Sequence, residues 1–268
     1  MVDDDGQLDA LVAGVLSSTK YGALVPDLVR AVARRELAAR RSLKAADKAT
    51  RTRLHRVAAA YLPGRMRYDA WLEELASARE AGEGALRRVC WDVLAHHAST
   101  RERLPILETF FATTLEGIEP RSVLDVACGL NPLAIPWMPL APGARYVACE
   151  VYRDLVAFLG AAMDLLGVDG TSEWRDVLHD PPRDEVDLAL LLKVIPCLEQ
   201  LDGEASARLL DHIVARHILV SFPVASLGGR DKGMVAHYDG RMRALLAGRP
   251  WRVKRHLFET ELAFLLSR

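Results

Sequence analysis

Ser122-Val-Leu-Asp-Val-Ala-Cys-Gly-Leu-Asn-Pro132 contains the clearest structural pattern in the chain. The run from Ser122 to Val126 is mainly apolar and β-branched, which predicts a short buried strand. A turn follows at Gly129, where the missing Cβ lets the backbone approach a ligand closely. Pro132 has the fixed φ of a first helical turn, so a helix is expected next. Strand, glycine turn and helix in this order form the crevice of doubly wound α/β sheets, and Asp125 is expected to face that crevice.

The turn is not a phosphate-binding loop, because neither Gly-x-x-x-x-Gly-Lys nor Gly-x-Gly-x-x-Gly occurs in it. It is similar to the cofactor loop of S-adenosylmethionine (SAM) methyltransferases, although Cys128-Gly129-Leu130 retains only one of the usual two glycines. A strand, turn and helix without any ligand is the alternative if the stretch is considered alone.

Short apolar segments continue from this stretch to the end of the chain and alternate with helical ones near 152–166 and 203–215. This alternation predicts an α/β, Rossmann-like fold with a parallel sheet, closed at one edge by two antiparallel strands. The expected strands are Val123–Val126, Tyr146–Cys149, Glu173–Arg175, Val186–Leu192, Ile218–Phe222, Trp251–Leu257 and Glu261–Leu266.

The chain of 268 residues is long enough for such a domain and an extension, and we expect a division into 1–104 and 105–268. No apolar run is long enough to span a bilayer, and the acidic start Met-Val-Asp-Asp-Asp is unlike a signal peptide. The four cysteines are widely spaced without a Cys-x-x-Cys pair, which argues against a metal site or disulfides. These features favour a cytoplasmic protein without a metal and without a membrane partner.

The N-terminal part reads as helices over 7–40 and 43–61, and it is strongly basic. Residues 20–67 hold thirteen Lys and Arg against three acids, a local net charge of +10. A solvated helix face is the simpler reading for one isolated helix. So many cations with so few acids favour a surface that binds the RNA backbone. The basic residues expected at RNA are Lys20, Arg34, Lys44, Lys48, Arg51 and Arg53.

Three charged residues stand at the ends of successive expected strands. Glu150 ends the second strand, where an acid accepts hydrogen bonds from ribose hydroxyls in nucleoside-binding folds. Asp176 follows the third strand and is expected near an adenine edge, and Lys193 ends the fourth. Each alone is typical of a surface or capping residue, but their joint placement predicts a cofactor crevice.

Two rival motifs are rejected. Asp180-Pro-Pro-Arg183 lacks the aromatic residue of amino-group methyltransferases and precedes the fourth strand. Pro196-Cys197 resembles the nucleophile of cytosine methyltransferases, but a cysteine is more often a small buried apolar group. The glycine-rich segment after the fifth strand is expected to contact RNA through Arg230, Lys232 and Met234.

Taken together, the chain resembles the aminoglycoside-resistance 16S rRNA methyltransferases that modify guanine N7 in the decoding site. The resemblance extends over nearly the whole chain. It rests on Lys20-Tyr21 with the following Val-Pro-Asp-Leu-Val-Arg, Thr52-Arg-Leu-His55, His97-Ala-Ser-Thr-Arg-Glu-Arg-Leu104, Asp125-Val-Ala-Cys-Gly-Leu-Asn-Pro132, Leu192-Lys193, Ser221-Phe-Pro223, Ser226-Leu-Gly-Gly-Arg230, Lys232-Gly-Met234 and Thr260-Glu-Leu262.

The resemblance implies SAM as cofactor, an all-helical N-terminal RNA-binding domain that docks on the 30S subunit, and resistance to kanamycin- and gentamicin-type drugs. It implies no DNA partner, and we expect a monomer. The cofactor residues it implies are Thr100, Arg101, Arg103, Ala127, Gly129, Glu150, Asp176 and Val177, to which Lys193 is added.

Guanine N7 has an exposed lone pair and no proton to lose, so the resemblance implies no general base and no enzyme nucleophile. Catalysis would consist mainly of positioning, with Lys193 as the candidate positioning residue and no certain catalytic residue. Two other functions remain open. They are a SAM-dependent methyltransferase acting on another RNA position or a small molecule, and a non-catalytic ribosome-binding protein.

Overall fold

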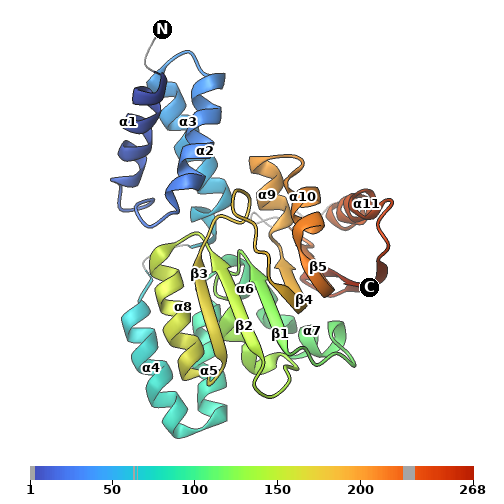
Figure 1. Ribbon diagram of the computed structural model, residues 1–268. Coiled ribbons are helices and arrows are strands. Elements are labelled where there is room, and N and C mark those ends of the chain that lie inside the picture. Colours follow the sequence, from blue (N-terminus) through green and yellow to red (C-terminus); the bar gives the residue numbers. More distant parts are fainter. Residues whose placement is uncertain (1–3, 63, 65, 226–232) are drawn as a thin grey trace.

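A seven-stranded sheet forms the centre of the computed structural model, which describes residues 4–62, 64, 66–225 and 233–268 (Figure 1). Its strand order is β3-β2-β1-β4-β5-β7-β6. The first five strands are parallel, and β7 runs antiparallel to β5 and β6, as the sequence predicts. The strands are β1 (Ser122–Val126), β2 (Arg145–Glu150), β3 (Asp169–Trp174), β4 (Glu185–Leu192), β5 (Val214–Pro223), β6 (Arg252–Leu257) and β7 (Glu261–Ser267).

The strand order reverses at β1, which places a crevice at the carboxyl ends of the strands. Leu124 of β1 pairs with Val147 of β2 on one side and with Ala189 of β4 on the other. In parallel α/β sheets such a reversal opens a space outside the carboxyl ends, because the connections leave it in opposite directions. The residues that follow β1, β2 and β4 therefore meet at one edge of the sheet.

The expected bounds of one strand were wrong. The third strand runs from Asp169 to Trp174 and not over 173–175. It is an edge strand with half-exposed polar residues, so its pairing with β2, and not an apolar pattern, defines it. The helix expected at Pro132 is present as the 3₁₀ helix η3 (Asn131–Trp137). Pro136 lies inside η3 and lacks the N–H that a continuing α-helix needs.

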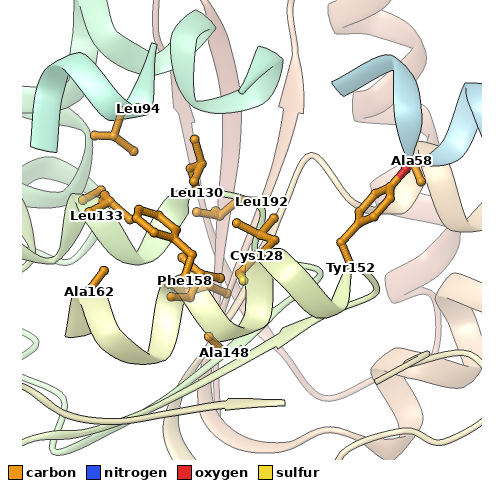
Figure 2. Close-up of a cluster of buried hydrophobic side chains, with 14 of the residues drawn as sticks. Ala58, Leu94, Cys128, Leu130, Leu133, Ala148, Tyr152, Phe158, Ala162 and Leu192 are labelled. Carbon is orange, nitrogen blue, oxygen red and sulfur yellow. The ribbon is translucent and has the colours of Figure 1, made fainter. Parts of the chain in front are cut away.

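Helices cover both faces of the sheet, and the strand side chains alternate between two apolar clusters. One face packs against α4 (Tyr68–Ala81), α5 (Glu83–Leu94), α7 (Leu107–Thr114), α8 (Arg153–Leu165) and η3. The other packs against α9 (Ile195–Leu201), α10 (Ala205–His212) and α11 (Met234–Leu246). Figure 2 shows part of the first cluster, around Leu130, Leu133 and Phe158. The short α6 (Ala98–Arg103) and η2 (Leu104–Ile106) join α5 to α7.

The first three helices form a bundle at one end of the molecule (Figure 1). They are α1 (Asp4–Leu16), α2 (Pro26–Ala39) and α3 (Leu43–Val57), followed by the 3₁₀ turn η1 (Ala59–Tyr61). Leu8, Leu11 and Val15 are buried, as the apolar spacing of α1 predicts. In the described part of the chain no helix has the length and apolarity needed to cross a membrane.

The bundle is tied to the loop that follows β2. The backbone N–H of Val25 donates to the carbonyl of Val151 at 3.0 Å, and that of Arg153 donates to Ala23 at 2.8 Å. Leu24 and Tyr152 thereby form an isolated antiparallel bridge. The first apolar cluster runs without a break from α1 into the sheet. The helical bundle and the crevice are therefore one packed unit.

Candidate functional site

A pocket lies at the carboxyl ends of the parallel strands, beneath the N-terminal bundle. It encloses about 780 Å³ of empty space, a volume that includes the open solvent at its mouth. The sheet contributes the predicted residues Ala127, Glu150, Asp176, Val177 and Lys193. Leu28, Val57, Ala58, Tyr61 and Leu62 of the N-terminal part form the opposite wall. Figure 2 shows Tyr152 from the loop after β2 pointing toward Ala58.

The turn after β1 has an unusual backbone conformation that the sequence only partly indicates. Gly129 has φ +55°, and an added Cβ would lie 2.7 Å from the His97 ring, so only glycine fits there. Ala127 has φ +50°, a strained value for a residue with a Cβ. Lys193, across the pocket, has φ +60°. Strained residues at two strand ends of one pocket are typical of a binding site.

Glu150 is buried at the end of β2, and its carboxylate is held by backbone groups. Its Oε2 accepts from the N–H of Gly129 at 2.9 Å, and its Oε1 accepts from Val151 at 2.7 Å. Burial raises the pKa of Glu150, although the N–H groups of Gly129, Val151 and Tyr152 oppose the rise. The side chain is thus fixed at the pocket wall, while its oxygens retain lone pairs for a ligand hydroxyl.

Asp176 is buried two residues after β3 and stabilises its own loop. Its Oδ1 accepts from the N–H of Leu178 at 3.0 Å, and its Oδ2 lies 2.5 Å from Nδ1 of His179. Val177 beside it is buried in the second apolar cluster. Both line the pocket, as predicted.

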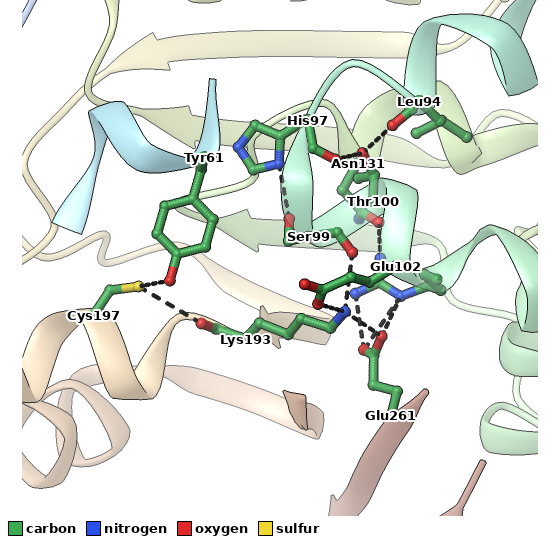
Figure 3. A network of polar contacts seen from close by, with 11 residues as sticks. Tyr61, Leu94, His97, Ser99, Thr100, Glu102, Asn131, Lys193, Cys197 and Glu261 are labelled. Carbon is green, nitrogen blue, oxygen red and sulfur yellow. Dashed lines mark hydrogen bonds and ion pairs between the residues drawn. The ribbon is translucent and has the colours of Figure 1, made fainter. Parts of the chain in front are cut away.

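Lys193 is buried at the end of β4 in a cluster of charged groups (Figure 3). Its Nζ donates to the Ser99 carbonyl at 3.0 Å and lies 3.0 Å from Glu102 and 3.2 Å from Glu261. We call Glu102, Arg103, Asn131, Lys193 and Glu261 the Arg103 cluster. Arg103 contacts Glu261 and Asn131, and Lys193 contacts Glu102 and Glu261. Lys193 therefore ties α6 to the sheet and also lines the pocket.

The guanidinium group of Arg103 contacts other side chains of the protein. It contacts Glu261 at 2.9 Å, donates to Asn131 Oδ1 at 2.8 Å and lies over the Phe110 ring. Burial by itself would raise the pKa of Glu261, but Arg103 and Lys193 outweigh it and hold that pKa below its usual range. Arg103 does not line the pocket.

The neighbouring predicted residues also lie outside the pocket lining. Thr100 is buried and donates to the carbonyls of Leu94 and His97, whereas Arg101 is exposed. Gly129 lies behind the wall, against the His97 ring. The pocket is lined instead by His97 and Ser99 of the same segment.

Asp125 does not face the crevice as expected. Its Oδ2 accepts from Asn131 and from the Tyr146 hydroxyl, each at 2.7 Å, beneath the turn. Burial raises its pKa to about 6, against the lowering effect of these two hydrogen bonds. Its Oδ1 is a buried acceptor for which the described residues supply no donor.

His97 and Tyr61 form a wall that the sequence did not reveal. Their rings stack with centroids 5.9 Å apart, and both line the pocket. Burial, with Lys193, Arg103 and Arg101 nearby, lowers the pKa of His97 to about 3, so its ring is neutral at physiological pH. Cys197 donates to the Tyr61 hydroxyl at 3.1 Å, and burial raises the pKa of its thiol, which argues against a nucleophilic role.

Comparison with known proteins agrees with this geometry. The family model described as "Ribosomal RNA methyltransferase (FmrO)" matches residues 17–265. The chain belongs to this family.

Relatives within the FmrO family cover nearly the full length. A protein of Micromonospora rosea named "16S rRNA (guanine(1405)-N(7))-methyltransferase" is 36% identical, over 98% of each chain. A protein of Serratia marcescens with the same name is 35% identical, over 97% of this chain and 98% of its own. The crystal structure of the 16S rRNA methyltransferase RmtF in complex with S-adenosyl-L-homocysteine is 31% identical, with a TM-score of 0.83 over 100% of this chain and 99% of that chain.

The basic residues of this FmrO-family member fall into two groups. Arg34, Lys44 and Lys48 are exposed on α2 and α3, and we call them the basic face. Lys20 is exposed nearby, with its Nζ 3.1 Å from His55 Nδ1. Arg51 and Arg53, which were also expected to contact RNA, make contacts within the protein. Arg51 binds Asp47 and the Gly14 carbonyl, and Arg53 binds Glu36 and the Gln200 carbonyl.

Three predicted RNA residues immediately precede or begin α11 in the sequence. Arg230 and Lys232 lie outside the described residues. Met234 is half-buried at the first position of α11. Among the residues that the structure describes, no group of His, Cys, Asp and Glu side chains is arranged to hold a metal ion.

Proposed function

We propose that the protein transfers a methyl group from SAM to N7 of guanine 1405 in 16S rRNA of the 30S subunit, and so gives resistance to aminoglycosides. One observation contributes most to this proposal: the pocket gathers Ala127, Glu150, Asp176 and Lys193 at adjoining strand ends, beside a basic helical face. The names of relatives that are 35–36% identical supply the nucleotide and the atom.

The pocket residues fit this cofactor. The backbone-held carboxylate of Glu150 suits the ribose hydroxyls, and Asp176 and Val177 suit an adenine. The crowded turn at Gly129 brings backbone close to the ligand at Ala127. Arg101, which is exposed on α6, would hold the cofactor carboxylate. Thr100, Arg103 and Gly129 act behind this wall by fixing the segment that His97 and Ser99 present.

Methyl transfer to guanine N7 requires little acid–base catalysis by side chains. When bound, SAM supplies a methyl group on a sulfonium ion, and its S–C bond breaks as the bond to guanine N7 forms. N7 carries a lone pair and no proton, so no side chain has to remove one. The neutral His97 ring and the bound Cys197 thiol agree with this, since neither is prepared as base or nucleophile. The task left to Lys193 and its neighbours is to hold the reactants in line.

We further propose the division of the chain at residue 104, with residues 1–104 docking on the 30S subunit and 105–268 carrying out the transfer. The exposed basic face supports this, because phosphate contacts fix a protein on RNA without reading its sequence. Lys20, Arg230, Lys232 and Met234 belong to the proposed RNA surface. A cytoplasmic monomer is the form expected for this task.

Methylation of purified 30S subunits with labelled SAM tests the proposal, with the product mapped by cleavage at N7-methylguanine. We expect a single cut at guanine 1405 that is absent with Glu150→Ala. Transfer to another nucleotide would leave the family intact but contradict the substrate. Binding of S-adenosylhomocysteine without transfer to 30S subunits, naked rRNA or small molecules would favour a non-catalytic ribosome-binding protein.

A further inference from the structure

A second hollow lies next to the cofactor pocket, between α2, α3 and the C-terminal half of the chain. It shares the lining residues Leu28, Leu178 and Leu201 with that pocket, so the two spaces adjoin. With its open mouth it encloses about 680 Å³. None of the residues that we have assigned to the cofactor lines it.

The rim of this hollow is cationic, and its three arginines come from three different helices. Arg35 belongs to α2, Arg53 to α3, and Arg208 to α10, while His179 follows β3. Asp202 is the one carboxylate among its described lining residues. Cations brought together by folding from distant parts of a chain mark a site more specifically than a run along one helix.

The contacts of these arginines leave positive charge uncompensated. Arg35 donates to the Leu201 carbonyl, and Arg53 to the Gln200 carbonyl at 2.6 Å, and both acceptors are neutral. Arg53 also pairs with Glu36, but that carboxylate is shared with Arg40. A guanidinium has five N–H donors, and these bonds use only one or two of them, so donors remain for an anion.

Arg208 is an exposed member of the rim. Its Nη2 lies 2.5 Å from Asp202 Oδ2, and 52% of its side chain is exposed. His179 stands between the two spaces, since its Nδ1 is bound to Asp176 of the cofactor pocket while the residue lines the hollow. The hollow therefore opens to solvent through Arg208 and reaches inward to the wall of the cofactor pocket.

The floor of the hollow is apolar, formed by Leu28, Ala31, Val32, Leu178 and Leu201. An apolar floor beneath a guanidinium rim matches a nucleotide, whose sugar and base present apolar faces and whose phosphate accepts bidentate Arg bonds. We propose that this hollow is a subsite for one nucleotide of the RNA substrate, with its phosphate on Arg35 and Arg208. Arg53 positions the rim by fixing the end of α9. The inference rests on the proposed function. It assigns part of the protein's contact with RNA to this hollow instead of to an exposed helix face.

The test measures initial rates of 30S methylation at several 30S and salt concentrations, with S-adenosylhomocysteine affinity by calorimetry. For Arg35→Ala and for Arg208→Ala we expect KM for 30S to rise about fivefold and the log–log salt slope to become shallower by about one. The turnover rate and the S-adenosylhomocysteine affinity stay at the wild-type values. For Asp202→Asn, which removes the acid of the rim, we expect the opposite: a lower KM and a steeper slope.

Arg216→Ala is the matched control, because Arg216 is 78% exposed at the start of β5, away from the crevice, and the charge change is the same. Arginine variants of the rim that behave like Arg216→Ala would refute the subsite while leaving the proposed function intact. A loss of S-adenosylhomocysteine affinity in those variants would also refute it, because the hollow would then serve the cofactor. No transfer to 30S subunits by the wild type would overturn the proposed function and the subsite with it.

Discussion

The Arg103 cluster and the basic face are both rich in charge, yet they place it in opposite surroundings. In the cluster, Arg103 and Glu261 are almost completely buried, and each donor has a definite acceptor. On the basic face, Arg34, Lys44 and Lys48 lie in solvent. The first set holds α6 and β7 together beside the pocket, and the second is exposed on the N-terminal bundle.

The difference matters because the surroundings decide what one charge contributes. A buried charge that loses its partner keeps the full cost of its desolvation. A single substitution in the cluster is therefore expected to lower the free energy of unfolding strongly. An exposed lysine contributes little to stability, and its field is available to another molecule. We therefore expect stability and RNA binding to separate between the two regions.

The largest effect is expected for Arg103→Leu, which removes one of the two cations at the buried Glu261 and the donor to Asn131 Oδ1. We expect a loss of about 3–5 kcal/mol in the free energy of unfolding, measured by urea denaturation. Arg101→Leu, on the same helix but exposed, is the matched control and should change stability by less than about 0.5 kcal/mol. If Arg103→Leu weakened S-adenosylhomocysteine binding at unchanged stability, Arg103 would be a cofactor ligand and the comparison would fail.

The next effect concerns the backbone of the pocket. Gly129→Ala adds a Cβ at φ +55° against the His97 ring, and we expect a loss of about 1–3 kcal/mol in the free energy of unfolding. Gly14→Ala in α1, where nothing lies within 4 Å of the added Cβ, should instead stabilise the protein by about 0.5–1 kcal/mol. Equal effects of the two substitutions would show that the turn is not strained.

A pH effect of intermediate size is expected from His97, which lies between the two cations of the cluster and the pocket. Its pKa is lowered to about 3 from the usual 6.5, so the folded state binds this proton more weakly than the unfolded state. Its contribution to stability is therefore complete above pH 6.5 and is lost as the pH falls toward 3. Between pH 6.5 and 5.5 the wild type should lose about 1 kcal/mol more than His97→Phe.

Denaturation curves at the two pH values measure this difference, with His55→Phe on the surface of α3 as the control. A loss that is the same in the wild type and in His97→Phe would mean that His97 is not responsible for it.

The smallest effect on stability is expected for the basic face. Lys44→Ala with Lys48→Ala should change the free energy of unfolding by less than about 0.5 kcal/mol, yet reduce the salt slope of 30S binding by about two. Arg53→Ala, which breaks the contacts to Glu36 and Gln200, should show the reverse, with a stability loss of about 1–3 kcal/mol. Filter binding and thermal denaturation distinguish the two outcomes.

Much of the pocket was predictable because parallel topology fixes where strand ends meet. Once the strands of Asp125, Glu150 and Lys193 are recognised, their carboxyl ends must lie together, and Glu150 and Lys193 do line the pocket. The polar edge strand β3 was predicted too short, since an apolar pattern is absent where one side of a strand faces solvent.

The rest depends on contacts between elements that no local pattern specifies. Glu261 reaches Arg103 only because β7 pairs with β5, and Tyr61 reaches the pocket only because η1 packs over it. The signal for Glu261 was its place in the family-like stretch Thr260-Glu-Leu262. Helical spacing likewise places Arg51 and Arg53 on α3 but does not tell which of them bind another part of the chain.

The bridge between Leu24 and Tyr152 has a consequence for biosynthesis. The N-terminal bundle leaves the ribosome early, but the loop that it docks against follows β2 and is made much later. Until then Leu24, which forms the bridge with Tyr152, lacks this partner in the nascent chain. We expect the bundle to remain protease-sensitive during translation and to become protected only after α8 has emerged. The proposed cofactor pocket of this ribosome-modifying enzyme would then be completed only late in the enzyme's own synthesis on a ribosome.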